Sequence, residues 1–497
     1  MEITTHLSVV RVLEHDVYKR KRPLDLGFVD FRTLEARKAA CEAEVRLNAR
    51  LAPDVYLGVV PVRDEGTIVD YAVHMRRLPD DARADEMLAR GALGHAEIAR
   101  VADVIAAFHA GAEGGPEIAR FGTAEAVAYN VEENFRQTEA TIGDYLSGEQ
   151  AAELRAFQRG VLRERDAVFA ERVARGRVRD GHGDLRLEHV YFEDADAPIV
   201  IDCIEFADRF RFADVCADVA FLSMDLAAHG RVDLAEAFLA HYARASNDYD
   251  LYELVDFYES YRATVRGKVS AILARDATVD DGTRAEAARA ARRAFLVAVA
   301  AERRSILRPA VVAVGGLIAS GKSTVADLVA RETSAPVVEA DRTRKHMLRV
   351  PATQRLDERA WSGAYDPKLT ELVYAEVLRR ADVVLRTGRP VVLDASFRSP
   401  AMRRAARELA ARHGVPFRFV ECRAPEGTCR ERLARRERET HVSDGRVAIF
   451  DAFAARYEPP RELPPEELLV LDTTRSLPET LAALRAHLDT WPLGLAG

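Results

Sequence analysis

The first 80 residues combine short apolar runs with one longer helical stretch. The helical spacing of apolar positions predicts a helix over Leu34–Leu51. The short runs predict four strands, and Pro61 is expected to end the third because proline lacks a backbone N–H group. The strands are expected at Ser8–Val17, Tyr18–Arg22, Val55–Val60 and Ile68–Met75. This pattern predicts a small, strand-rich lobe.

From about Ala96 the apolar pattern becomes helical. One helix face is predicted to carry Ile98, Val101, Val104, Ile105 and Phe108. An Ala/Arg/Glu-rich helix is expected over Thr283–Leu307, closed by Arg308 and Pro309. We therefore place a domain boundary there and predict two domains, residues 1–305 and 306–497.

After Pro309 strands and helices alternate. The order is strand, Gly-rich loop, helix, strand, helices, strand, helix and strand, which is typical of a parallel sheet with helices on both faces. The strands are expected at Ala310–Val314, Val337–Glu339, Val391–Leu393 and Phe417–Glu421. The second domain is thus predicted to be of the α/β class.

The composition argues against a membrane protein, a secreted protein and a disulfide-rich or zinc-binding protein. No apolar run approaches the roughly 18 residues of a membrane helix. The first residues lack the basic and apolar regions of a secretory signal, so a cytoplasmic location is expected. The five cysteines are odd in number and never in a CxxC pair, which argues against a disulfide framework or a zinc site. They are expected to be small buried residues.

The charge is unevenly distributed. The net charge is −8, yet residues 306–497 hold more Lys and Arg than acids. The basic residues form short clusters, which suit a compact anionic ligand better than a long duplex. Nucleic acid is therefore disfavoured as a partner.

Residues 316–323, Gly-Leu-Ile-Ala-Ser-Gly-Lys-Ser, satisfy the GxxxxGK[ST] pattern between a strand and a helix. Glycines let backbone N–H groups converge on phosphate, and the following helix adds a favourable dipole. Lys322 is expected to neutralise β- and γ-phosphate charge, while the Ser323 hydroxyl ligates magnesium. The predicted nucleotide-binding positions are Gly316, Ser320, Gly321, Lys322, Ser323 and Thr324.

Two acids follow neighbouring strands of this domain. Asp341 comes after the second strand and Asp394 ends the third. Both are expected at the sheet edge that carries the phosphate loop. Asp341 is predicted to accept the proton of an attacking hydroxyl, although a helix N-cap is the alternative. Arg344 is expected to hold an anionic acceptor or the transferring phosphoryl group, and Asp394 to orient magnesium.

An arginine cluster lies further on, at residues 430–438. Arg432 and Arg436 share a helix face and are predicted to close over a triphosphate as a lid. The interleaved acids leave open the alternative of an exposed, solvated helix.

Together these residues resemble the P-loop kinase group that includes polynucleotide kinase, gluconate kinase, chloramphenicol phosphotransferase and zeta-toxin-like enzymes. The resemblance covers about residues 310–460 and implies a kinase that uses ATP and Mg²⁺. The strand-end acid Asp394 is followed by Ala395, so the Asp-Glu pair of a mechanical ATPase is missing.

A second pair of acids lies in the first domain. Asp184 follows His182-Gly183, and Asp202 ends an apolar run 18 residues later. One carboxylate for an acceptor hydroxyl and one for magnesium is what phosphoryl transfer requires. Asp214 and Asp218 are expected to brace the loop of Asp184.

These residues resemble the aminoglycoside phosphotransferase family, over roughly residues 5–300. The resemblance implies an α+β, protein-kinase-like bilobal domain ahead of the α/β P-loop domain. It makes Asp184 the catalytic base and Asp202 a magnesium ligand, and it puts His189 where the family has a magnesium-binding Asn. A strand lysine paired with Glu44 is then expected to hold the α- and β-phosphates, with Lys19 preferred and Lys21 second.

The leading hypothesis is a bifunctional ATP-dependent kinase of hydroxyl groups on small molecules such as sugars, metabolites or antibiotics. A second hypothesis makes the first domain a degenerate sensor, because Thr5–Val17 contains no glycine and because of His189. A third is 5′-hydroxyl polynucleotide kinase activity. The sequence leaves the acceptor, the nucleotide preference and the oligomeric state open.

Overall fold

The computed structural model describes residues 1–4, 7–25, 30–194, 197–300, 307–356, 359–438 and 441–492. The chain divides into two compact units. The first consists of Met1–Ala235 and Leu254–Glu302, and the second of Glu236–Glu253 and Arg303–Gly497. The segment Glu236–Glu253, which the sequence placed in the first domain, thus lies in the second unit. The domain boundary at residue 305 itself stays a prediction.

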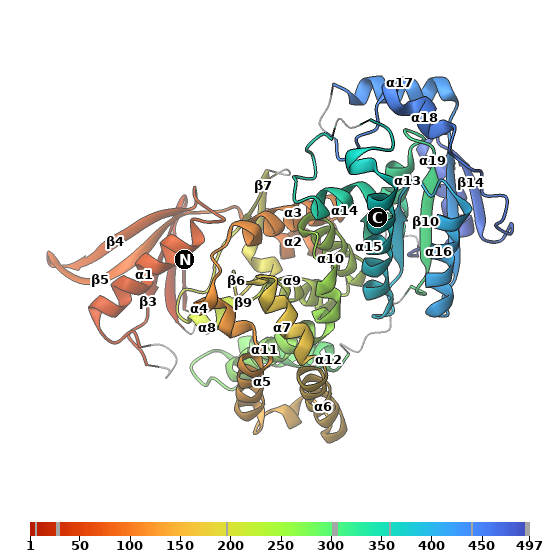
Figure 1. Cartoon of the computed structure of the whole chain (residues 1–497). Coiled ribbons are helices and arrows are strands. Elements are labelled where there is room, and N and C mark those ends of the chain that lie inside the picture. The colour runs from red at the N-terminus through yellow and green to blue at the C-terminus, as the bar shows by residue number, and fades with distance from the viewer. Residues whose placement is uncertain are drawn as a thin grey trace. The chain divides into compact units, whose positions relative to one another are not determined.

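The first unit begins with an antiparallel sheet of strand order β1-β2-β3-β5-β4 (Figure 1). Its strands are β1 (Glu2–Thr4), β2 (Ser8–Val12), β3 (Asp16–Lys21), β4 (Tyr56–Asp64) and β5 (Thr67–Arg76). Helix α1 (Leu34–Asn48) starts where the Thr33 side chain accepts a hydrogen bond from the Ala36 N–H group. Its buried Cys41 packs with Val55, Val73 and Met75 of the sheet. The predicted strand-rich lobe therefore forms around one apolar core.

The predicted end of a strand at Pro61 is wrong. Strand β4 runs on to Asp64, and Pro61 lies opposite Tyr71 of β5. β4 is the edge strand of the sheet. A proline is tolerated there because no further strand needs its missing N–H group.

A helical lobe completes the first unit. Its longer helices are α3 (His95–Gly111), α5 (Ala124–Thr138), α6 (Gly148–Glu164), α7 (Asp166–Ala174), α9 (Val215–Ala228), α11 (Val255–Ala274) and α12 (Asp281–Val299), and the shorter ones are α2 (Ala84–Ala89), α4 (Pro116–Ala119) and α8 (Asp208–Arg211). The lobe also contains two small antiparallel strand pairs. One joins β6 (Val178–Asp180) to β9 (Phe212–Asp214), and the other joins β7 (Val190–Asp194) to β8 (Ala197–Val200).

Helix α3 buries Ile98, Val101 and Ile105, as its spacing predicts. Helix α12 ends at Val299 and not at Leu307. The predicted continuation over residues 301–306 lies outside the described residues.

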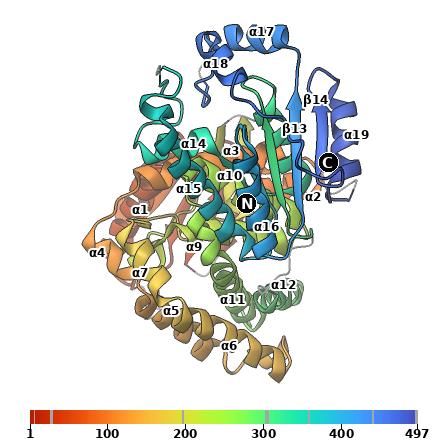
Figure 2. The same cartoon turned by 45° about the vertical axis from the view of Figure 1, so that its right-hand side comes forward.

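The second unit contains a parallel sheet of strand order β11-β12-β10-β13-β14. Its strands are β10 (Val311–Gly316), β11 (Val337–Glu339), β12 (Val391–Asp394), β13 (Phe417–Arg423) and β14 (Leu468–Asp472). Its helices are α13 (Lys322–Thr333), α14 (Ala340–Met347), α15 (Pro367–Leu385), α16 (Pro400–Arg412), α17 (Glu426–Arg436), α18 (Phe450–Ala454) and α19 (Leu477–His487). Figure 2 shows β13 and β14 side by side, with α19 near β14. The sequence analysis missed β14, a short edge strand in which Leu471 alone is buried.

The segment Glu236–Glu253 comprises the later part of α10 (Val232–Ser246) and a 3₁₀ turn. Arg244 forms ion pairs with Glu339, at the end of β11, and with Asp327 on α13. The Tyr249 hydroxyl donates a hydrogen bond to the carbonyl oxygen of Val337. This segment therefore packs along the edge strand of the parallel sheet.

All five cysteines are free and buried, as the sequence predicts. Among the described residues, no helix is long and apolar enough to cross a membrane.

Candidate functional sites

The phosphate loop lies between β10 and α13. Gly316 and Gly321 have φ of +139° and +92°, a region that favours glycine. A Cβ atom at Gly316 would lie 2.4 Å from the carbonyl oxygen of Cys422, so the strand end accepts no side chain. The Lys322 ammonium donates a hydrogen bond to the Leu317 carbonyl at 2.8 Å. Burial lowers the pKa of Lys322.

The two predicted acids meet at the edge of the sheet beside this loop. Parallel pairing sets Asp394 opposite Val314 of β10 and opposite Glu339 of β11. Asp341 stands in the first turn of α14, directly after β11. Glu339 holds the N-cap position of that helix, so Asp341 does not have the capping role that the sequence left open. Both carboxylates line one cavity with Lys322.

The two carboxylates have altered proton affinities. Burial raises the pKa of Asp394 to about 7, and the negative charge of Glu339 adds to this shift. Burial also raises the pKa of Asp341, against the opposing charge of Arg344. A raised pKa suits a group that accepts a proton near neutral pH.

The predicted arginines occupy different places. Arg344 and Arg436 line the cavity. Arg344 donates hydrogen bonds to the Ala364 carbonyl at 2.7 Å, while its buried Nε has no partner among the described residues. Arg432, which does not line the cavity, donates instead to the carbonyl oxygens of Ala319 and Thr473. The structure therefore brings Arg436, but not Arg432, to the cavity.

Of the other residues predicted to bind the nucleotide, some line the cavity and some do not. Ser323 and Gly321 line the cavity, whereas Thr324 is exposed and does not. The Ser320 hydroxyl is buried behind the loop without a hydrogen-bond partner in the described chain.

Sequence reasoning missed one wall of this cavity. It is formed by side chains from loops and short helical turns, among them Tyr365, Arg398, Asp444 and Phe453 of α18. The Tyr365 hydroxyl donates to Asp444 at 2.7 Å, and the fully buried Lys345 pairs with the same carboxylate at 3.0 Å. These residues belong to no motif, and only the fold brings them together.

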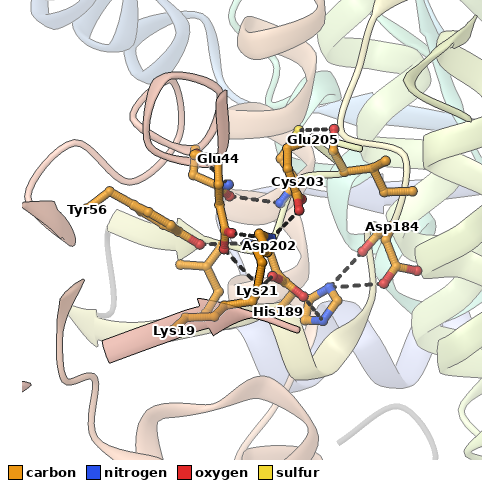
Figure 3. A network of polar contacts seen from close by, with 12 residues as sticks. Lys19, Lys21, Glu44, Tyr56, Asp184, His189, Asp202, Cys203 and Glu205 are labelled. Atoms are coloured by element: carbon orange, nitrogen blue, oxygen red, sulfur yellow. Dashed lines mark hydrogen bonds and ion pairs between the residues drawn. The ribbon is translucent and has the colours of Figure 1, made fainter. Parts of the chain in front are cut away.

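In the first unit, two strand lysines and one helix glutamate form a buried network (Figure 3). Lys19 of β3 pairs with Glu44 of α1 at 2.9 Å and also with Asp202. Lys21 pairs with Glu44 at 2.6 Å and with the buried Glu205. Burial raises the pKa of Glu44, but Lys19 and Lys21 outweigh it and hold the pKa below its usual value. Both predicted lysines therefore share the predicted glutamate, and only Lys19 also reaches Asp202.

Asp202 adopts a left-handed backbone conformation with φ of +64°, which is uncommon for a residue other than glycine. Its N–H group donates to the Tyr56 hydroxyl at 3.1 Å. Burial alone would raise the pKa of Asp202, but Lys19 and His189 hold it well below the usual range. The carboxylate is therefore ionised at neutral pH.

Asp184 and His189 lie on the other side of Asp202. The His189 Nδ1–H group donates to the Asp184 carbonyl oxygen at 2.8 Å. The other ring nitrogen, Nε2, lies 3.5 Å from Asp202 Oδ2 and 3.4 Å from a guanidinium nitrogen of Arg186. Arg186 donates to both carboxylate oxygens of Asp184, at 3.1 and 3.2 Å. Burial opposes the shift, yet Arg186 and His189 hold the pKa of Asp184 at about 2.

Hydrogen bonds to Asp218 hold the loop that carries Asp184. Asp218 accepts hydrogen bonds from the N–H groups of His182 and Gly183, at 2.6 and 2.9 Å. Asp214 pairs with the buried Arg172 and caps α9. Asp218 thus braces this loop directly, as predicted, while Asp214 acts on the neighbouring helix.

Relatives over nearly the whole chain are known. The uncharacterized protein Rv2004c of Mycobacterium tuberculosis (strain ATCC 25618 / H37Rv) is 34% identical over 454 residues, which cover 91% of this chain and 89% of the relative. The uncharacterized protein Mb2027c of Mycobacterium bovis matches with the same identity and coverage. This chain belongs to the family of these mycobacterial proteins.

A family model described as an AAA domain matches residues 311–460. The match contains the phosphate loop and both acids of the parallel sheet, and it confirms the predicted P-loop domain.

Solved structures match each region. The GDP complex of wild-type aminoglycoside 2′-phosphotransferase-IIIa covers 59% of this chain and 91% of its own, at 14% identity and a TM-score of 0.37. A gluconokinase from Sinorhizobium meliloti 1021 covers 36% of this chain and 93% of its own, at 22% identity and a TM-score of 0.26. The predicted fold class, a bilobal α+β domain followed by an α/β domain with a parallel sheet, is confirmed by the elements of the two units.

The donor groups present fit a magnesium ion in the second unit. Among the described residues, no group of three or more His, Cys, Asp or Glu side chains gathers as a metal site. Magnesium that arrives with a triphosphate needs only one or two protein ligands. The Ser323 hydroxyl and the Asp394 carboxylate supply two oxygen donors beside the loop. In the first unit Asp202 supplies oxygen, but His189 supplies nitrogen, which suits magnesium less well.

Proposed function

We propose that the protein is an ATP-dependent phosphotransferase with two active sites, which transfers phosphoryl groups to hydroxyl groups of small molecules in the cytoplasm. The observation that carries the proposal is the cavity of the second unit, which gathers the phosphate loop and two carboxylates of raised pKa. Such a constellation serves proton removal and charge stabilisation during phosphoryl transfer.

In the second unit the residues have distinct roles. Lys322 and the loop N–H groups bind the β- and γ-phosphates. Asp341 accepts the proton of the acceptor hydroxyl, whose oxygen forms the new bond to the γ-phosphorus while the bond to the bridging oxygen of ADP breaks. Arg436 stabilises the negative charge that develops on the transferring group. Ser323 and Asp394 would hold a magnesium ion, which neutralises phosphate charge when bound.

In the first unit Lys19, held by Glu44, binds the α- and β-phosphates, and Asp184 accepts the acceptor proton. Lys21 stabilises Glu44 from the other side and keeps it ionised. Asp202 and His189 would hold the metal ion of this site.

One observation favours the alternative of a sensor in the first unit. Both oxygens of the Asp184 carboxylate accept hydrogen bonds from Arg186, so this group is already occupied. A domain that binds a nucleotide without transferring its phosphate would regulate the second unit.

Separate inactivation of the two sites tests the proposal. Wild-type protein, Asp184→Asn and Lys322→Ala are each incubated with ATP, magnesium and a panel of hydroxyl compounds, and acceptor-dependent ADP release is measured. Each substitution is expected to reduce one set of activities by roughly two to three orders of magnitude.

Three results are informative. Unchanged turnover in both variants would exclude the proposed sites. Loss of every activity in Lys322→Ala, with none lost in Asp184→Asn, would assign the first unit a sensor role. Nucleotide binding by the Asp184→Asn protein, followed by calorimetry, separates a catalytic defect from a folding defect.

A further inference from the structure

Two arginines of the cavity in the second unit lie near a third arginine that is exposed beside the cavity. Arg344 and Arg398 line the cavity itself. The guanidinium carbons of Arg398 and Arg456 each lie 4.3 Å from the ring centroid of Trp361. The Trp361 ring stacks on Phe453 at 4.6 Å. We call Arg344, Arg398 and Arg456 the arginine cluster.

Within the described part of the chain, no carboxylate forms an ion pair with Arg344, Arg398 or Arg456, although the charge of Arg344 acts on Asp341. Other arginines of this unit are paired, such as Arg403 with Glu462 and Arg389 with Glu236. Burial, together with the like charges of the other two members, lowers the pKa of Arg398. Several guanidinium groups held together without an acid are typical of a site for an anion.

The arginines of the cavity come from other elements than the phosphate loop. Lys322 begins α13, whereas Arg344 lies on α14 and Arg398 follows β12. Asp341 is on α14 as well, three residues before Arg344, and lines the same cavity. An acceptor whose hydroxyl reaches Asp341 thus presents its other end to the arginine cluster.

The backbone conformation of Trp361 is consistent with a ligand site at the arginine cluster. Trp361 has φ of +64°, a left-handed conformation that is costly for a bulky side chain. Such strain concentrates at ligand sites, where it fixes the direction of a side chain. Here it holds the indole ring against two guanidinium groups, which fixes their planes through cation–π contacts.

We propose that the acceptor of the second unit carries an oxyanion, a carboxylate or a phosphate, that binds to Arg344 and Arg398 with Arg456 at the rim. The inference rests on the proposed function of this site and names the class of its acceptor. A neutral polyol leaves the cluster unpaired and loses charge-assisted hydrogen bonds. The expected discrimination against it is roughly ten- to a hundredfold.

Tryptophan fluorescence makes the cluster directly observable. The chain has two tryptophans, and Trp491 is buried and donates to the Ser334 hydroxyl. In the full-length Trp491→Phe protein, Trp361 is therefore the sole reporter. The phosphate loop is first filled with ADP and magnesium. D-Glycerate, glycerol 3-phosphate, glycerol and inorganic phosphate are then titrated, which separates a carboxylate source from a phosphate source on one carbon skeleton.

A saturable change is expected with at least one of the two anionic glycerol derivatives and none with glycerol. Arg398→Gln should weaken this binding by roughly ten- to a hundredfold, and Arg398→Lys should restore part of it. Arg412→Gln, on the exposed end of α16, is the matched control and should bind as the unchanged protein does.

Several outcomes would overturn the inference. Binding of glycerol that is as tight as that of the tighter-binding anionic derivative, unchanged anion binding in Arg398→Gln, or no response to any oxyanion would each do so. A 5′-hydroxyl oligonucleotide that binds more tightly than every small anion would assign the cluster to nucleic acid instead. Anion binding to the Trp491→Phe protein, in which Lys322 is intact, together with no ATP turnover by that protein with any acceptor, would uphold the cluster and refute the phosphotransferase.

Discussion

At the scale of single residues, the carboxylate of Asp394 in the second unit has a strongly raised pKa. Asp394 is 7% exposed and lies beside Glu339, another buried acid. Burial first and Glu339 second raise its pKa to about 7. The group is thus poised to lose its proton when a cation or a cationic side chain approaches.

This pKa predicts a pH-dependent stability. The folded protein without nucleotide binds the Asp394 proton more tightly than the unfolded chain does, since an ordinary Asp has a pKa of 3.8. Its contribution to stability is therefore present below about pH 4 and is lost as the pH rises through about 7. Both tryptophans belong to the second unit, so urea unfolding followed by their fluorescence reports on it. Asp394→Asn should flatten the decline between pH 4 and 7, and an identical decline in both proteins would contradict the assignment.

His189 predicts an unusual metal preference in the first unit. Its Nε2 atom lies 3.5 Å from Asp202 Oδ2, and a nitrogen ligand suits manganese better than magnesium. In a Lys322→Ala background, where the second site is disabled, Mn²⁺ should bind the ATP complex with an advantage over Mg²⁺. His189→Asn should reduce this advantage by roughly tenfold. Free Mn²⁺ measured by electron paramagnetic resonance, with Mg²⁺ as competitor, checks this, and an unchanged ratio would exclude His189 as a ligand.

At the scale of elements, the central strands of the parallel sheet could be predicted from the sequence, whereas the edge strands could not be predicted fully. The parallel strands β10 to β12 are buried apolar runs and β13 is mostly buried, so the positions of these strands and their polar ends follow from the sequence. β14 and the passage of β4 through Pro61 depend on being at a sheet edge, which local sequence does not encode. The same holds for the site. Motif residues such as Lys322 and Asp394 were predictable, whereas Trp361 and Arg398 act through loops that only the fold brings together.

The junction of β10 with the phosphate loop tolerates no side chain. A Cβ atom at Gly315 would lie 2.4 Å from the Phe419 ring, and one at Gly316 would meet the Cys422 carbonyl. Gly315→Ala is therefore expected to destabilise the second unit by about 1–3 kcal/mol through overpacking. Gly427→Ala in helix α17, where the added atom meets nothing within 4 Å, should be neutral or stabilising. Fluorescence-detected urea midpoints check both, and equal midpoints would contradict the packing argument.

At the scale of the whole molecule, the chain does not divide at a single point. Glu236–Glu253 belongs to the second unit although about fifty residues of the first unit follow it. Its pattern is an ordinary amphipathic helix and turn, so the sequence offered no reason to separate it from the first domain. The ion pair between Arg244 and Glu339 spans 95 residues and arises only in the folded chain. A fragment limited to residues 306–497 would therefore lack a native part of its own unit.

Arg244 predicts how this segment influences the catalytic edge of the sheet. Its guanidinium donates two hydrogen bonds to Glu339, which is 6% exposed and raises the pKa of Asp394. Arg244→Ala leaves Glu339 with Arg342 as its remaining charged partner, and it should lower the free energy of unfolding of the second unit by about 1–3 kcal/mol. The less neutralised Glu339 should also raise the pKa of Asp394, which moves the pH-dependent decline of stability to higher pH.

The control is Arg407→Ala, which removes an arginine that is half exposed and paired with Glu467, where a surface ion pair contributes little. Urea midpoints of the two variants across pH 5 to 8 separate the cases. A drop confined to Arg244→Ala, together with the shifted decline, would link the segment to the chemistry of Asp394. Equal small effects would mean that Glu339 is neutralised by Arg342 alone, and that the segment contributes packing without electrostatic influence on the site.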